Sequence, residues 1–73
     1  MNKKQNMRLN GVIAKYAAMD GVNSRIAQAE RARISYPCYR RRVENIGLFT
    51  LDELDRVVRT FRIPWNEIME ALQ

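Results

Sequence analysis

Apolar residues recur at the three- and four-residue spacing of an α-helix in five segments of the chain. The predicted helices cover residues 7–19, 24–32, 36–45, 51–61 and 64–72. No stretch alternates between apolar and polar residues as a strand does, and no hairpin dipeptide occurs. The pattern therefore predicts an all-α fold, a compact five-helix domain.

Local capping signals indicate where three of these helices begin. Residues 50–53 form a capping box, in which Thr50 caps the backbone and Glu53 reaches back to it. Either Asn23 or Ser24 caps the second helix by accepting a bond from a free backbone N–H. Ser35 is expected to cap the third helix, with Pro37 in its first turn, where a missing N–H costs nothing.

The middle of the chain predicts two short helices joined by a tight turn. On the second of them, Tyr39 and Val43 lie four residues apart and mark the buried side. Ala29 allows the two helices to approach each other closely, and Ile34 fills the turn. The outward side carries arginines. This is the anatomy of a helix-turn-helix, in which the first helix fixes the second at the angle that fits the major groove of DNA.

The charge is distributed unevenly, and its distribution says more than its total. The chain has 73 residues and a formal net charge of +5. Residues 1–22 carry +3, residues 23–45 carry +4 and residues 46–73 carry −2. A positive patch of this kind is typical of proteins that bind a polyanion, although a solvated basic surface has the same composition. We expect residues 1–6 to form a flexible basic N-terminal arm, reaching the minor groove through Lys3 and Lys4, and residues 7–73 to form a single domain.

Several short motifs resemble the Cro/repressor-type helix-turn-helix proteins of bacteriophages and prophages. They are Ala29, Ile34-Ser35, the run at 39–43 (Tyr-Arg-Arg-Arg-Val), the run at 49–54 (Phe-Thr-Leu-Asp-Glu-Leu) and Arg62-Ile63. The resemblance implies a sequence-specific regulator of transcription, a phage or prophage repressor, that inserts the helix after Ser35 into the major groove of double-stranded DNA. It also implies a homodimer on a two-fold operator, joined through the C-terminal helix, with half-sites about 10 bp apart.

The resemblance assigns nine residues to the DNA contact: Asn23, Ser24, Arg25, Ser35, Tyr36, Pro37, Arg40, Arg41 and Glu44. Arg40 and Arg41 are expected at base edges or adjacent phosphates, because a guanidinium pairs with guanine O6 and N7 through two donors. The first three residues would hold a phosphate together with the dipole of their helix. Arg42 either contacts DNA as well or pairs with Glu30 or Glu44.

Two positions depart from the family pattern. Arg33 stands where the turn usually has glycine, which costs about 1 kcal/mol if its φ is positive. Gln28 stands where an apolar residue usually precedes the alanine, and Ile26 is expected to take over its packing.

The composition argues against an enzyme, a cofactor or a metal site. The chain has no histidine, no cysteine–histidine cluster and no glycine-rich phosphate loop. A single cysteine, Cys38, excludes an internal disulfide and favours the bacterial cytoplasm or nucleoid, and no apolar run is long enough to span a membrane.

Two alternative functions use the same composition. The first is a protein-binding module on a helix-turn-helix scaffold, an antitoxin or an inhibitor of a host enzyme. Its partner surface would be four apolar residues: Phe61, Trp65, Ile68 and Met69. The second is a basic protein of the membrane surface, which the regular apolar stripes disfavour.

Overall fold

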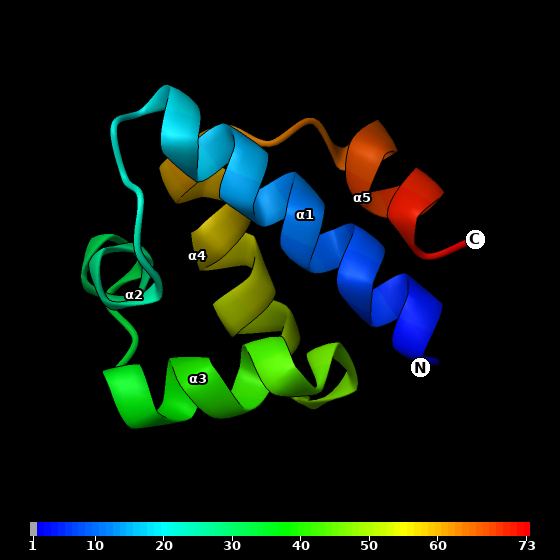
Figure 1. The fold of residues 1–73 in the computed structure, drawn as a ribbon, viewed down its shortest axis with the longest axis horizontal. Coiled ribbons are helices and arrows are strands. Elements are labelled where there is room, and N and C mark those ends of the chain that lie inside the picture. The colour runs from blue at the N-terminus through cyan, green and yellow to red at the C-terminus, as the bar shows by residue number, and fades with distance from the viewer. Residues whose placement is uncertain (1) are drawn as a thin grey trace.

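A computed structural model describes residues 2–73 and folds them into five α-helices, one short 3-10 helix and no strand (Figure 1). The elements are α1 (Lys3–Met19), α2 (Arg25–Ala32), α3 (Tyr36–Glu44), η1 (Ile46–Leu48), α4 (Leu51–Phe61) and α5 (Trp65–Ala71). The all-α class is confirmed. None of these helices is long and apolar enough to cross a membrane, for the part of the chain that is described.

The helices enclose one hydrophobic core, to which every helix contributes. α1 packs on α3, α4 and α5, and α2 packs on α3 and α4. In Figure 1 α3 lies along one edge of the molecule, with α4 behind α1 and α5 beside the first half of α1. The largest fully buried side chains are Leu9, Ile13, Tyr39, Val57 and Ile68. The edge position of α3 leaves one of its sides open to solvent.

The N-terminal arm expected at residues 1–6 is wrong for residues 3–6, which belong to α1. Asn2 caps the helix by accepting from the N–H of Gln5, whose side chain accepts from the N–H of Asn2. Polar cap partners at both positions give this end the same support that a Thr/Glu pair gives elsewhere. Met1 lies outside the described residues. Lys3 and Lys4 are therefore exposed residues of a helix and not part of a flexible arm.

The other helix ends lie within one or two residues of the predicted ones. The capping box is confirmed, with Thr50 Oγ1 accepting from the Glu53 N–H at 3.0 Å and the Glu53 carboxylate accepting from the Thr50 N–H at 3.1 Å. Ser24 caps α2 by accepting from the Ala27 N–H at 3.1 Å. Ser35 occupies the position before α3, but its side chain makes no capping bond, so that expectation is wrong.

Three helices end in the same way, with a residue of positive φ followed by a buried branched residue. The pairs are Gly21 (φ 77°) before Val22, Arg33 (φ 59°) before Ile34, and Arg62 (φ 55°) before Ile63. In each pair the N–H of the branched residue donates to the carbonyl five residues earlier, at 2.9–3.0 Å. This left-handed ending satisfies carbonyls that the helix leaves free. The burial of Ile34 confirms the prediction that it fills the turn, and the positive φ of Arg33 means that the cost of a non-glycine residue applies there.

Two apolar residues expected in the core lie on the surface instead. Ile26 is 53% exposed, whereas Gln28 is buried, so Ile26 does not take over the packing of that position. Leu51, in the first turn of α4, is 86% exposed, whereas Val57, Val58 and Phe61 further along the same helix are buried. Periodicity alone did not separate the first turn of α4 from its buried middle.

Replacing Arg62 by glycine is predicted to stabilise the protein. A left-handed residue with a Cβ costs about 1–2 kcal/mol, and the extra freedom of unfolded glycine offsets about 0.5–1 kcal/mol of the gain. Thermal unfolding of Arg62→Gly should therefore show a net gain of about 0.5–1 kcal/mol over Arg62→Ala, which removes the same exposed side chain but keeps the Cβ. Equal stabilities for the two variants would contradict the prediction, because the strain at this position would then only match the entropic cost of glycine.

Candidate nucleic-acid interface

The inner side of α3 is fixed by one fully buried tyrosine. Tyr39 and Val43 are both buried, as predicted, and the Tyr39 hydroxyl donates to Gln28 Oε1 of α2 at 2.7 Å. Burial raises the pKa of Tyr39 to about 12, against a smaller lowering by the nearby Arg25 guanidinium, so the hydroxyl stays a neutral donor. Its ring also meets Phe49 edge to face, with centroids 6.2 Å apart. Gln28 is thus the polar partner that a buried tyrosine requires.

The C-terminal end of α3 is held by two asparagines of α1. The side-chain amides of Asn6 and Asn10 donate to the carbonyl of Val43 at 3.1 and 2.7 Å. The Asn6 side-chain oxygen also accepts from the N–H of Ile46 at 2.6 Å. A carbonyl in the last turn of a helix lacks an intrahelical partner, and these amides supply one. Sequence analysis missed both residues, although their spacing of four, next to Leu9, places them on the edge of the buried stripe of α1.

An ion pair joins the side of α3 to α4. Arg42 Nε lies 3.0 Å from Glu53 Oε1, and the two side chains are only 21% and 14% exposed. Burial alone would raise the pKa of Glu53, but bonds from the Thr50 N–H and from Arg42 outweigh it and lower that pKa overall. One interpretation of the sequence paired Arg42 with Glu30 or Glu44, but its partner is Glu53. The Arg42 side chain therefore lies on the side of α3 that faces α4 and not on the side that faces solvent.

The outward face of α3 carries five exposed residues at helical spacing: Tyr36, Pro37, Arg40, Arg41 and Glu44. Arg40 Nε lies 3.4 Å from Glu44 Oε1, with both side chains more than half exposed. A pair this open to water contributes about 0–1 kcal/mol and is readily exchanged for another partner. Arg41 makes no ion pair with any residue between 2 and 73. The guanidinium groups predicted to contact DNA are thus not consumed by internal contacts.

The four other predicted site residues are exposed as well: Asn23, Ser24, Arg25 and Ser35. The first three stand at the start of α2, a helix that packs on α3. Ser24 uses its oxygen to cap α2, which leaves its hydroxyl hydrogen free to donate. The structure therefore gathers basic and hydroxyl groups along α3 and the start of α2.

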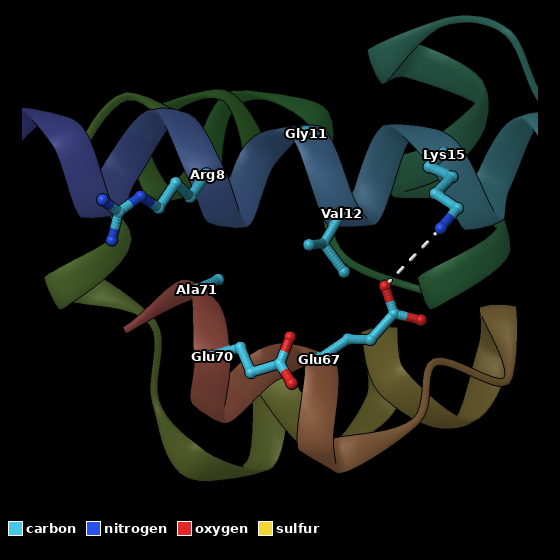
Figure 2. A pocket seen from close by; sticks show the side chains of 7 residues that line it. All are labelled: Arg8, Gly11, Val12, Lys15, Glu67, Glu70 and Ala71. Carbon is cyan, nitrogen blue, oxygen red and sulfur yellow. Dashed lines mark ion pairs between the residues drawn. The ribbon is translucent and has the colours of Figure 1, made fainter. Parts of the chain in front are cut away.

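A separate hollow lies between α1 and α5, and none of the nine predicted residues lines it. Its walls carry Arg8 and Lys15 on α1 and Glu67 and Glu70 on α5, with Val12 between them (Figure 2). Lys15 Nζ lies 3.6 Å from Glu67 Oε1, and the same carboxylate accepts a bond from the Tyr16 hydroxyl. Acidic and basic side chains both line this hollow, and Lys15 is already paired with Glu67. The hollow therefore does not suit a polyanion.

The apolar partner surface expected near the C-terminus is only half exposed. Phe61 and Ile68 belong to the core, whereas Trp65 and Met69 are 49% and 60% exposed. The two exposed residues lie one turn apart on α5 and share a face.

The Arg42–Glu53 pair predicts a pH dependence of stability. Because the folded pKa of Glu53 lies below its ordinary value, its contribution is full above that value and is lost as the pH falls through the folded pKa. Glu53→Gln keeps a side-chain oxygen for the Thr50 N–H and removes the charge that pairs with Arg42, so it should lower the free energy of unfolding by about 1–2 kcal/mol at pH 7. The difference from the parent should shrink towards pH 3.

Denaturant unfolding between pH 3 and pH 7 measures this difference. The matched control is Glu70→Gln, because Glu70 is exposed and makes no ion pair within the described chain. A constant difference between Glu53→Gln and the parent at every pH would mean that the charge of Glu53 contributes nothing.

Comparison with known proteins identifies no relative of this chain. No family model, no curated protein and no solved structure matches the chain. What bears on function is therefore an exposed arginine-rich face, anchored from behind by Tyr39 and open to solvent along its length.

Proposed function

We propose that this protein is a transcriptional regulator of the Cro/repressor helix-turn-helix type, which binds double-stranded DNA by inserting α3 into the major groove. The observation that carries the proposal is the contrast between the two sides of α3. Its inner side is fixed through Tyr39 and Val43, while Arg40 and Arg41 stand exposed on the other side.

The dimensions of α3 suit this role. An α-helix with its side chains is about 10–12 Å across, and the major groove, about 12 Å wide, admits it. The exposed face begins with Tyr36 and Pro37 and continues through both arginines. An arginine that reads guanine O6 and N7 through two donors contributes about 1–3 kcal/mol of discrimination.

The surrounding charge supports the same proposal. Residues 23–45 carry +4 and residues 46–73 carry −2, so the field favours a polyanion at α2 and α3 rather than at α5. Arg25, the Ser24 hydroxyl and the positive end of the α2 dipole lie where a phosphate beside the groove would be held. Lys3 and Lys4 belong to a helix and are left out of the proposed contact.

We further propose that the protein binds as a homodimer on a two-fold operator. Trp65 and Met69 supply an exposed apolar face on α5, on an element that bears none of the proposed DNA contacts. Sedimentation of the saturated complex should give two chains per duplex, and one chain per duplex would contradict the dimer.

Arg41→Ala is predicted to weaken binding to the preferred duplex by about 1–3 kcal/mol, with little change in stability. The guanidinium of Arg41 has no ion-pair partner to lose among residues 2–73, so its removal should act on the DNA contact. A mobility-shift assay at moderate salt, on DNA from around the protein's own gene and on random duplex of equal length, measures the effect.

The matched control is Arg59→Ala, which removes an equal charge from an exposed residue of α4. No preference of the parent for either duplex would contradict the proposed function. A parent that shows the preference together with an Arg41→Ala variant that keeps it would contradict the contact assigned to Arg41.

A further inference from the structure

We propose that Arg56 of α4 is a positioning residue for DNA recognition: it holds the turn between α2 and α3 and thereby sets the angle at which α3 leaves the molecule. The inference rests on the proposed function for its consequence in DNA binding. The structural part of the inference, that α4 holds the turn, rests on the contacts of Arg56 with Arg33 and Asp52.

Arg56 is the residue of α4 that reaches the turn. Its Nη1 donates to the carbonyl oxygen of Arg33 at 3.0 Å, across 23 positions of sequence. Its Nη2 lies 3.2 Å from Asp52 Oδ2, one turn back along α4. Its Nε is buried without a partner among residues 2–73. The guanidinium is thus oriented by Asp52 and aimed at one backbone carbonyl, at the cost of one unsatisfied donor.

The carbonyl that Arg56 binds belongs to the residue at which the chain changes direction. Arg33 has a left-handed backbone (φ 59°), and the chain turns there from α2 towards α3. A positive charge at this place also faces the negative end of the α2 dipole, which is favourable. The bond therefore stabilises a conformation that a residue with a Cβ otherwise avoids.

The start of α3 has little other support. Ser24 and Thr50 cap α2 and α4 with their side chains, but Ser35 makes no such bond at α3. The side-chain anchors of α3 itself, Tyr39 and the Arg42–Glu53 pair, begin in its second turn. Besides the burial of Ile34 and the backbone bonds of the turn to α2, the Arg56 bond ties the turn preceding Tyr36 and Pro37 to α4. Those residues lead the face proposed to enter the groove.

The test compares two arginines of α4, of which Arg56 is 41% exposed and Arg59 is 80% exposed. Arg56 and Arg59 each pair with an aspartate one turn back, but only Arg56 bonds to the turn. Arg56→Ala should reduce the preference for own-gene DNA over random duplex about tenfold, as expected for loss of one hydrogen bond to a charged group. Binding to random duplex should match that of Arg59→Ala, with the same dependence on salt, since no phosphate contact is lost.

A second measurement keeps the turn testable without DNA. In NMR spectra of Arg56→Ala, the Arg33 carbonyl should shift and the amides of residues 34–36 should lose order and protection from exchange, whereas Arg59→Ala should leave them unchanged. Arg56→Lys keeps the charge and the long stem but offers one nitrogen. It should fold and show an intermediate loss of preference, which guards against an alanine variant that unfolds.

The possible outcomes separate the two proposals. A parent without preference for own-gene DNA overturns the proposed function and the role of Arg56 in it together. A parent with that preference and an Arg56→Ala variant that keeps it overturns the role of Arg56 alone. An unchanged turn in the NMR spectra of Arg56→Ala overturns it as well. A salt dependence that falls by about one charge relative to Arg59→Ala would make Arg56 a phosphate contact and not a positioning residue.

Discussion

The hydrogen bond between Tyr39 and Gln28 is the interaction on which the orientation of α3 depends. Both side chains are buried, and an unpaired buried hydroxyl would cost about 1–3 kcal/mol. Rotating α3 about its axis would break this bond and expose Val43, so only one side of the helix can face inward. That choice fixes Arg40 and Arg41 on the side that faces solvent.

Polar contacts from α1 and α4 also hold α3 in place. Asn6 and Asn10 bind the carbonyl of Val43 from α1, and Glu53 binds Arg42 from α4. Each contact satisfies a group that would otherwise be left unpaired where water is scarce. In a chain of 73 residues, whose core is necessarily small, such contacts give a short helix a defined position.

The features predicted well from the sequence are those with local causes. The Thr50/Glu53 capping box, the burial of Tyr39 and Val43 and the filling of the turn by Ile34 each depend on residues close together in the chain, and all are confirmed. The outward face of α3 followed from the same spacing, and its exposure is as expected, whereas its contact with DNA stays a prediction.

The features missed depend on contacts between distant residues. Asn6 looked like part of a polar arm, because its partners at 43 and 46 are far along the chain. Gln28 looked like a flaw in an apolar position, and only the buried Tyr39 hydroxyl explains it. Arg42 was one of three consecutive arginines, and only the fold distinguishes it by bringing Glu53 alongside. Charge and periodicity cannot rank such residues, because the partner is supplied by tertiary packing.

Insertion of α3 into the major groove is tested most directly by mapping the amide NMR shifts of the protein as duplex DNA from around its own gene is added. If α3 enters the groove, the shifts should concentrate at residues 23–25 and 35–41, on one side of the α2–α3 unit. Amides beside the α1–α5 hollow, such as Lys15 and Glu67, should stay in place. Shifts centred on that hollow, with the amides of α3 unmoved, would contradict it.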